Sequence, residues 1–380
     1  MNALRIGLIV NPVAGLGGPC AQKGSDAADI RSIAAAAGIL ESSPVRALRC
    51  LRQLLALLDS AERECVLVTG PGELGAATAQ GLAPTLVLEA GTGSPGATTA
   101  DDTRAAAAGI LAAGVDLLVF SGGDGTARDV LDSVGTSVPV VGIPAGVKIY
   151  SAVFALSAAA AGSLAAAWLL GENRETAERE VVDIDETALR AGLAVPALYV
   201  YLRVPVDPGR LQERKRASPA SDANAVRALA LSYIRRMNPD CLYILGPGGT
   251  THAIGTELGL DLTRLGVDVV RGGQLIARDV DAPTLDSIIG TGTATAVLTP
   301  LGGQGFLIGR GNQQLSAPVL RRCRLEVIAT AGKLASLGAR PLRVDSGDDA
   351  LDASLHGYTH IFTGPGAETI YPIRSTREES

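Results

Sequence analysis

The chain has 380 residues, of which 47% are hydrophobic but only 3% aromatic, and its formal net charge is −6. This length allows two domains, and an apolar content supplied largely by Ala, Val and Leu is typical of α/β layers. The acidic balance, with a pI of about 5.3, weighs against a broad basic surface, so we expect no nucleic-acid partner.

The cysteine pattern and the first residues indicate the compartment. Residues 1–12 contain one basic residue and a short apolar run, which predicts a first strand rather than a signal peptide. No two cysteines are close enough for a zinc or redox pair, so we expect reduced packing cysteines and a cytoplasmic protein. The cysteines are Cys20, Cys50, Cys65, Cys241 and Cys323.

An uncharged stretch from residue 152 to residue 170 has about the length that spans a bilayer. Ala, Gly and Ser dominate it, and these residues gain little from insertion into lipid. The stretch also follows a Gly/Pro-containing loop of an α/β pattern. We therefore expect a buried helix here and no membrane partner.

The first third of the chain alternates between short apolar segments and segments of helical periodicity. Strands this apolar are buried on both faces, as in a parallel sheet covered by helices. The expected strands are 4–10, 64–70, 85–91, 116–122 and 139–144. The expected helices are 46–59, 73–82, 100–114 and 126–135.

After Glu172 the sequence changes character, beginning with a charged stretch. We expect an α/β domain for nucleotide and phosphate over 1–172 and a β-rich α+β domain for substrate over 173–380, its C-terminal end returning to the first. Gly272 and Gly273 predict a hairpin turn inside 265–280. The other expected strands are 196–206, 240–246, 293–299, 324–330 and 358–364.

The segment SGGDGTARD begins at the end of an expected parallel strand, where α/β proteins form ligand crevices. Gly122, Gly123 and Gly125 allow the backbone to approach a ligand closely. The N–H groups that open the next helix can then face a phosphate, and Thr126 can cap that helix or donate to the phosphate.

Asp124 is an acid placed where anions would bind. Such a carboxylate is costly unless it handles a metal ion or a proton, and this combination suggests phosphoryl transfer. In a loose transition state positioning matters more than basicity, so Asp124 would hold Mg²⁺ indirectly or accept the proton of an attacking hydroxyl. The alternative is an ordinary strand-to-helix turn with Asp124 as N-cap.

Two further segments of the first domain contain candidate phosphate ligands. NPVAGLGG follows the first strand and supplies Asn11 and Gly15, and Lys23 lies just beyond it. In PAGVKIYSAVFA, Lys148 is a candidate to neutralise a transferring phosphoryl group, and Tyr150 is a candidate acceptor-binding residue.

Two glycine-rich segments of the second half suit a polar ligand with phosphates or ribose hydroxyls, the alternative for the second being a surface loop with bulges. They are GPGGTT and TPLGGQGFLIGRGNQQ. We expect their acceptor-binding residues to line the same cleft as GGDGT. These residues are Gly248, Gly249, Thr250, Thr251, Arg310, Asn312 and Gln313.

Two smaller patterns are less specific. VVDIDE places Asp183 and Asp185 at strand spacing, which fits either a metal or ribose site or a solvated strand end. His356 and His360 stand four residues apart without a third ligand, which favours packing or surface positions over a metal site. We expect no metal site built from protein ligands alone.

Taken together, IVNPVAGLGG, FSGGDGTARDV, GIPAGVKIYSAVFA and LGPGGTT resemble the ATP-NAD kinases. They are most similar to the long branch described as predicted ATP- or polyphosphate-dependent NAD kinases, which includes acetoin-catabolism accessory proteins. LGVDVV, TPLGGQGFLIGRGNQQLS and GARPLRVDSGD extend the similarity to about residue 365. The GGDG motif alone is shared with diacylglycerol, sphingosine and 6-phosphofructo kinases.

The resemblance implies a phosphofructokinase-like N-terminal domain and a β-rich C-terminal domain. It implies transfer of the ATP γ-phosphoryl group to the 2′-hydroxyl of the adenosine ribose in NAD, with Mg²⁺. By position, Asp124 matches the family's catalytic aspartate. Gly122, Gly123, Gly125 and Thr126 match its phosphate-contacting turn.

The sequence also departs from the family pattern. Ordinary NAD kinases have an Asn-Glu pair at the start of the second domain and a later Gly-Ser-Thr-Ala-Tyr run, both of which hold the dinucleotide. The corresponding regions here read DIDE and GPGGTT. The acceptor is therefore NAD, then another hydroxylated or nucleotide-like metabolite, then a lipid, in that order of expectation.

The donor is ATP or polyphosphate, and we expect a homo-oligomer. A non-catalytic nucleotide-binding regulator is the alternative from a different class. The presence of Asp124 with its glycines weighs against that alternative, because a protein that had lost kinase activity would not need this carboxylate.

Overall fold

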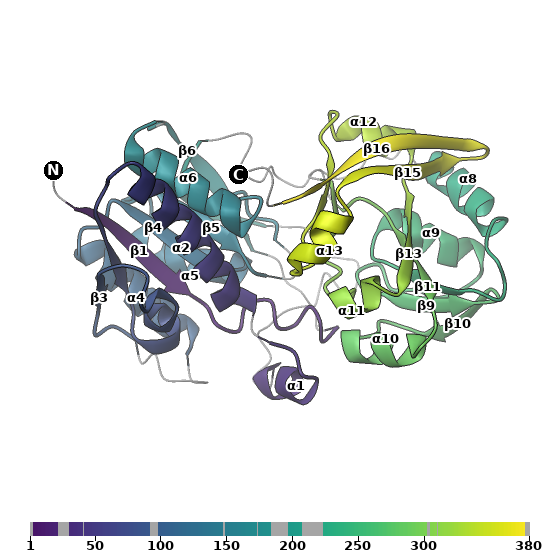
Figure 1. The fold of residues 1–380 in the computed structure, drawn as a ribbon, viewed down its shortest axis with the longest axis horizontal. Coiled ribbons are helices and arrows are strands. Elements are labelled where there is room, and N and C mark those ends of the chain that lie inside the picture. Colours follow the sequence, from purple (N-terminus) through teal and green to yellow (C-terminus); the bar gives the residue numbers. More distant parts are fainter. Residues whose placement is uncertain are drawn as a thin grey trace. The chain divides into compact units, whose positions relative to one another are not determined.

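The computed structural model describes residues 3–21, 30–40, 42–91, 98–146, 149–172, 174–183, 197–206, 223–301, 305–309 and 311–376. The chain forms two compact units, and Figure 1 labels most of their elements. Unit 1 comprises Met1–Gly17, Lys23–Arg214 and Glu379–Ser380. Unit 2 comprises Gly18–Gln22 and Lys215–Glu378.

Unit 1 is built on a five-stranded sheet in which every neighbouring pair is parallel, in the order β3-β2-β1-β4-β5. This confirms the parallel α/β fold expected from the apolar strands. The sheet strands are β1 (Leu4–Val10), β2 (Cys65–Thr69), β3 (Thr85–Val87), β4 (Leu117–Gly122) and β5 (Val140–Pro144).

Two sets of helices cover this sheet. α2 packs on α6 and on strands β4 and β5, whereas α4 packs on α5 and on β1 and β2. All residues of β4 and β5 are buried as a result, which explains why neither strand alternates with polar residues. The helices are α1 (Ile30–Ala36), α2 (Ser42–Ser60), α3 (Ala76–Ala79), α4 (Ala100–Ala112), α5 (Asp124–Val134) and α6 (Ala158–Leu170).

The buried helix expected over 152–170 begins later, at Ala158. Ser157 caps it by accepting a hydrogen bond from the Ala160 N–H. The residues before the cap hydrogen-bond instead to β5, because the Gly142 N–H donates to the Val153 carbonyl at 3.0 Å. None of the described helices is long and apolar enough to cross a membrane.

Two other expectations for unit 1 were too long. The helix expected over 73–82 is a 3₁₀ turn, Gly72–Leu74, followed by the one-turn helix α3, because Gly75 between them has φ +148°. The strand expected over 85–91 ends at Val87.

Unit 1 extends through Arg214, beyond the expected boundary at residue 172. The reason is an antiparallel pair, β6 (Thr176–Asp183) and β7 (Ala197–Pro205), that contacts β5 and α5. The charged residues of β6 resemble a linker in the sequence, yet they belong to a strand that is partly exposed. The expected return of the C-terminal end concerns residues outside the described part of the chain.

Unit 2 contains a nine-stranded mixed sheet in the order β10-β9-β8-β11-β13-β15-β16-β14-β12, which confirms the strand-rich second half. β8, β11, β13 and β15 are parallel to one another. Its strands are β8 (Leu242–Leu245), β9 (Asp268–Arg271), β10 (Gln274–Ala277), β11 (Ala294–Leu298), β12 (Phe306–Ile308), β13 (Cys323–Ile328), β14 (Leu342–Val344), β15 (Gly357–Gly364) and β16 (Ala367–Ser375).

The described helices of unit 2 connect these strands. They are α8 (Ala223–Ile234), α9 (Gly249–Glu257), α10 (Ala282–Ile289), α11 (Ala317–Leu320), α12 (Ala331–Ser336) and α13 (Asp349–Ser354). The predicted hairpin is confirmed as β9–β10. Gly272 and Gly273 both have positive φ, +56° and +73°, the backbone geometry that a two-residue type I′ turn requires.

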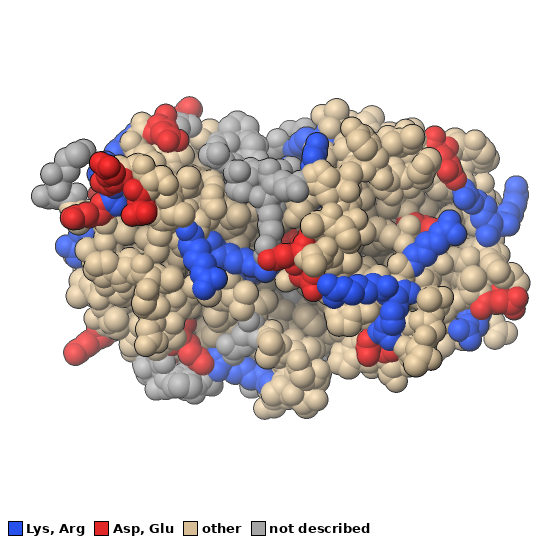
Figure 2. Space-filling model, in the orientation of Figure 1, with Lys and Arg blue, Asp and Glu red and all other residues tan. Residues whose placement is uncertain are grey.

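Charged side chains of both signs are interspersed on the face shown in Figure 2. Several described arginines pair with exposed carboxylates, for example Arg278 with Asp261 at 2.8 Å and Arg321 with Asp348 at 2.8 Å. On this face the described residues therefore present mixed charge rather than one broad basic area.

Candidate active site

The centre of the unit 1 sheet is a topological switch point. β1 and β4 are neighbours, but the chain leaves β1 toward β2 on one side and leaves β4 toward β5 on the other. The turns after the two strands consequently diverge, and such crevices are where α/β proteins bind ligands. Asn11 follows β1, and Gly123 and Asp124 follow β4, so the predicted turns lie at this point.

A side-chain hydrogen bond joins the two turns. The Asn11 Nδ2 group donates to Thr126 Oγ1 at 2.9 Å, and the Asn11 backbone N–H donates to the Ser121 carbonyl at 3.0 Å. Thr126 is only 3% exposed. Asn11 and Thr126, both predicted to bind phosphate, therefore join the two turns through their side chains.

Two of the predicted glycines are required by the protein's own packing. A Cβ on Gly122 would lie 2.3 Å from Thr126 Oγ1, and a Cβ on Gly15, whose φ is +89°, would lie 2.1 Å from the Ala145 carbonyl oxygen. Gly125 differs from both, because it is exposed and nothing lies within 4 Å of its Cβ position. Of these three glycines, Gly125 is the one that leaves open space beside the backbone.

The loop after β5 contacts the same turn. The Gly122 carbonyl accepts hydrogen bonds from the N–H groups of Ala145 and Gly146, at 2.9 and 3.1 Å. A Cβ on Gly146 would lie 2.8 Å from the Gly123 Cα. Two glycines therefore allow the β4 and β5 loops to touch backbone to backbone.

Asp124 is the first residue of α5 and is half-buried. Its Oδ2 atom accepts a hydrogen bond from the Tyr150 backbone N–H at 2.8 Å, and its Oδ1 atom accepts one from the Ser151 N–H at 3.0 Å. The N-cap of α5 is Gly123. The interpretation of Asp124 as an ordinary N-cap is therefore wrong, and its carboxylate is clamped by the loop after β5.

The start of helix α2 also reaches this edge of the sheet. Ser43 is fully buried, and its hydroxyl lies 2.9 Å from the Ser121 hydroxyl. A Cβ on Gly15 would lie 2.7 Å from Ser42 Oγ. The helix expected over 46–59 therefore begins earlier, at Ser42, and Ser-Ser-Pro before an apolar run is the helix-start signal that accounts for it.

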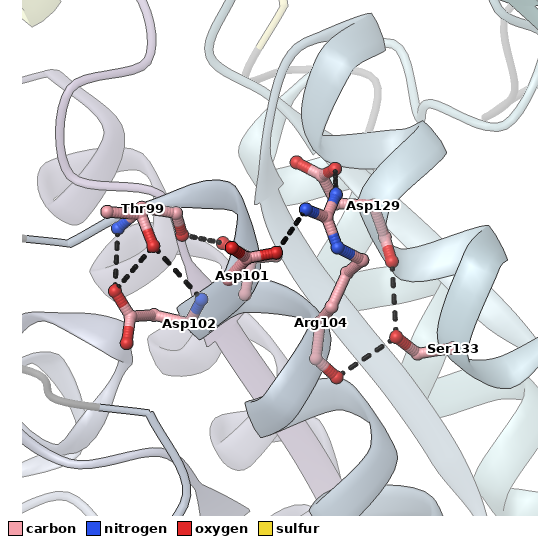
Figure 3. A network of polar contacts seen from close by, with 7 residues as sticks. Thr99, Asp101, Asp102, Arg104, Asp129 and Ser133 are labelled. Atoms are coloured by element: carbon pink, nitrogen blue, oxygen red, sulfur yellow. Dashed lines mark hydrogen bonds and ion pairs between the residues drawn. The ribbon is translucent and has the colours of Figure 1, made fainter.

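A polar network fixes the helix that begins with Asp124 (Figure 3). Arg104 of α4 donates to Asp129 of α5 at 2.5 Å and to the exposed Asp101, and Ser133 donates to the Arg104 carbonyl at 3.0 Å. Burial raises the pKa of Asp129, and Arg104 opposes that rise. Figure 3 also shows the capping box formed by Thr99 and Asp102 at the start of α4.

In unit 2, the GPGGTT segment forms the turn between β8 and α9. Gly248 caps α9 with φ +137°, and its Cβ would lie 2.5 Å from Thr299 Cγ2. Thr250 and Thr251 are 3% and 1% exposed, and Thr251 Oγ1 donates to the Gly248 carbonyl at 2.9 Å. Gly249 has nothing within 4 Å of its Cβ position.

The side chain of Asn312 is used within its own loop. It is 1% exposed, its Nδ2 group donates to the Leu307 carbonyl at 2.8 Å, and its Oδ1 atom accepts from the Gly309 N–H at 2.9 Å. The neighbouring Gln313 has a buried Oε1 atom without a hydrogen-bond partner. That oxygen lies 3.0 Å from the Cβ position of Gly18.

Leu301 brings the two predicted acceptor loops of unit 2 together. Its side chain lies 3.7 Å from the Cβ position of Gly248 and 3.6 Å from that of Gly311. A lysine that the sequence analysis missed lies at the same strand ends, because Lys333 Nζ donates to Thr299 Oγ1 at 3.1 Å. The sequence signal for it is a threonine that can cap a helix after β13, followed by a lysine within that helix, α12.

Several predicted site residues lie outside the described residues, namely Lys23, Lys148, Asp185 and Arg310. Asp183 ends β6, and its side chain is likewise outside the described part. His356 lies 2.7 Å from Arg374, and His360 lies 3.7 Å from Glu368. Among the described residues, no three His, Cys, Asp or Glu side chains gather as a metal site.

Comparison with models of known protein families shows to which family the chain belongs. The family model of the ATP-NAD kinase N-terminal domain matches residues 6–172, and that of the C-terminal domain matches residues 238–373. The chain belongs to the ATP-NAD kinase family. No curated protein and no solved structure matched it.

Membership places this chain in a family of kinases. The first match covers the whole switch point of unit 1, from β1 to the end of α6. The second covers the GPGGTT turn, the Asn312 loop and most of the unit 2 sheet. The predicted site residues thus fall within the two domains that define the family, except Asp183 and Asp185, which lie between the two matches.

Proposed function

We propose that this protein transfers the γ-phosphoryl group of ATP to the 2′-hydroxyl of the adenosine ribose of NAD, forming NADP. The observation that carries the proposal is Asp124, held at the switch point of a chain that contains both domains of the ATP-NAD kinase family. Membership of this family supports phosphoryl transfer as the reaction class, and the clamped Asp124 carboxylate is the group that would take part in it.

In the proposed reaction, the acceptor hydroxyl oxygen forms a bond to the γ-phosphorus, and the bond from the γ-phosphorus to the bridging oxygen breaks. The hydroxyl proton passes to the Asp124 carboxylate, and ADP leaves. The transition state of such transfers is loose, so holding the acceptor in line contributes more than a strong base does.

The start of α5 suits the phosphate groups. The first N–H groups of a helix have no partner within the helix, and they face an anion favourably. Gly125 lies in this first turn with open space beside it, so a phosphate can approach the backbone there. Asn11 and Thr126 would hold this turn at its distance from the β1 loop.

Mg²⁺ would arrive with ATP. It usually keeps several waters and binds through one or two carboxylates together with substrate phosphates. Asp124 is a carboxylate in the phosphate-binding turn, and this fits contact with the ion through water. Mg²⁺ would supply charge neutralisation between the β- and γ-phosphates. Polyphosphate is the alternative donor.

One observation favours a second candidate for the acceptor. Thr251 and Asn312, both predicted to bind the acceptor, direct side-chain hydrogen bonds to the protein's own backbone. Fewer free polar groups then remain for a dinucleotide. A smaller hydroxylated or nucleotide-like metabolite is therefore the alternative acceptor, whereas a non-catalytic regulator would have no use for Asp124.

The cytoplasmic location of this activity stays a prediction. All five cysteines are free thiols, which is the state expected in the cytoplasm. We also retain the expectation of a homo-oligomer.

The acceptor can be tested with purified protein, Mg²⁺, and either ATP or polyphosphate. NAD, NADH, nucleosides, inositols and diacylglycerol are offered separately, and each product is identified by mass. NADP formation together with a rise in the melting temperature on adding NAD supports the proposal. Phosphorylation of a different alcohol without any effect of NAD would leave only the kinase class.

A further inference from the structure

Ser151 connects the Asp124 carboxylate to strand β6. It is 1% exposed, and its backbone N–H donates to Asp124 Oδ1 at 3.0 Å. Its side-chain Oγ atom accepts a hydrogen bond from the Val182 N–H at 2.9 Å. One buried residue therefore touches the proposed catalytic carboxylate with its backbone and the end of β6 with its side chain.

The backbone after Ser151 follows the same strand. The Ala152 N–H donates to the Glu180 carbonyl at 3.0 Å. Glu180 and Val182 are two residues apart, so their hydrogen-bonding groups point to the same edge of β6. Residues 151 and 152 thus run along β6 like a short extra strand, in which the Ser151 hydroxyl oxygen replaces a backbone carbonyl.

The next residues are held by a different strand. The Val153 carbonyl accepts from the Gly142 N–H at 3.0 Å, and the Ala155 N–H donates to the Gly142 carbonyl at 2.9 Å. Within the described part of this loop, the Ser151 side chain attaches the backbone to β6 directly beside the two N–H groups that clamp Asp124. Tyr150, which supplies the other clamping N–H, directly precedes it.

We infer that Ser151 is a positioning residue for phosphoryl transfer. Its hydroxyl holds the backbone of residues 150 and 151 against β6, so that their two N–H groups orient the Asp124 carboxylate. This inference rests on the proposed function, because it assumes that Asp124 acts on the acceptor hydroxyl. A displacement of about 1 Å in a catalytic group can reduce the rate about 10²-fold.

The substitution Ser151→Ala tests this role. It removes the hydrogen-bond acceptor of the Val182 N–H, and Val182 is only 3% exposed. It also frees the loop that clamps Asp124 to shift. We expect kcat to fall about 10- to 100-fold, less than the 10²–10⁴-fold typical of removing a general base. KM for the donor should stay within about twofold, since the turns that contain Asn11 and Gly125 are untouched. Ser151→Thr keeps the hydroxyl and should restore most of the lost kcat.

Ser163→Ala is a matched control in the same unit. Ser163 lies in α6, is 4% exposed, and its Oγ atom accepts a hydrogen bond from Gln53 Nε2 at 3.1 Å. Both changes remove a hydroxyl from a buried serine, but the hydrogen bond of Ser163 joins α6 to Gln53 of α2 and does not involve the loop that clamps Asp124. Its substitution should lower the melting temperature without lowering kcat.

A second measurement does not depend on activity. Amide hydrogen exchange of a peptide covering residues 149–156 should speed up in Ser151→Ala and remain unchanged in Ser163→Ala. If kcat and exchange in Ser151→Ala match those of Ser163→Ala, the positioning role is overturned. If the wild type phosphorylates no acceptor, the proposed function fails, whereas the exchange result still decides whether Ser151 holds the clamp.

Discussion

Asn11 donates from its side-chain amide to the hydroxyl of Thr126 at 2.9 Å, which joins the turn after β1 to the first turn of α5. The two residues are 115 positions apart in the sequence. They meet because β1 and β4 are adjacent at the switch point of the sheet. The bond therefore sets the width of the crevice in which we propose that phosphate binds.

Removing this bond should loosen the crevice. Thr126→Val keeps the shape of the side chain but leaves the Asn11 amide without its acceptor. We expect a loss of about 1–3 kcal/mol in the free energy of unfolding, together with a rise in KM for the donor. Thr126→Ser keeps the hydroxyl, and urea unfolding should place it closer to the wild type. Equal stability of the valine and serine variants would contradict the role of the bond.

Gly122 and Gly125 should respond differently to the same substitution. Gly122→Ala places a Cβ 2.3 Å from Thr126 Oγ1, and such overpacking typically costs about 1–3 kcal/mol. Gly125→Ala meets nothing within 4 Å and lies in a helix, so stability should rise by up to about 1 kcal/mol. Urea unfolding measures both effects. A Gly125→Ala variant that is more stable but slower would indicate close approach of phosphate to the backbone, whereas equal stability of the two variants would refute the packing argument.

Asp124→Asn should reduce turnover by about 10²–10⁴-fold, the usual contribution of a general base. The clamp complicates this test, because an amide has only one acceptor oxygen and its NH₂ group would face one of the two clamping N–H groups. We therefore also expect a loss of stability of about 1–3 kcal/mol. Asp116→Asn is the control, since Asp116 accepts from the Arg5 N–H at 2.8 Å at an exposed position. Turnover of Asp124→Asn near the wild-type rate would remove Asp124 from the chemistry.

The Arg104–Asp129 pair should make stability depend on pH when Arg104 is lost. Burial raises the pKa of Asp129 above its ordinary value of 3.8, and Arg104 opposes this rise. A carboxyl group with a raised pKa in the folded state binds more protons folded than unfolded, so stability falls as pH rises above 3.8. In Arg104→Met the pKa of Asp129 rises further, so the loss of stability with rising pH becomes larger.

The urea midpoint of Arg104→Met should therefore approach that of the wild type near pH 3.8 and drop below it as pH rises toward neutral. Arg278→Met breaks an exposed ion pair with Asp261 and serves as the control. The interpretation fails if the gap between Arg104→Met and wild type is the same at every pH, or if the control shows the same widening.

The parallel sheet of unit 1 could be predicted because its strands are short and apolar and because they alternate with segments of helical periodicity. The hairpin at Gly272 and Gly273 could be predicted from its turn residues alone. β6 could not, because its charged residues resemble a linker and its pairing with β7 depends on distant parts of the chain. Local pattern does not encode such pairing.

In the candidate site, too, some features could be predicted from the sequence and others could not. Asp124 and its glycines stand out because few other functions explain an acid within a glycine-rich strand-to-helix turn. The role of the Ser151 backbone could not be predicted, since a hydrogen bond from a main-chain N–H leaves no mark on residue type. The packing demands of Gly15 and Gly122 were also hidden, because a glycine required by a neighbouring atom looks like one required by a ligand.

The central claim is that this chain phosphorylates the 2′-hydroxyl of NAD. The most direct measurement incubates the wild type and Asp124→Asn with NAD, ATP and Mg²⁺ and assays the product with a dehydrogenase strictly specific for NADP. The account predicts NADP from the wild type and a loss of about 10²–10⁴-fold in its rate of formation in the variant. It would be contradicted if the folded wild type formed no NADP while phosphorylating another alcohol, or if Asp124→Asn formed NADP at the wild-type rate.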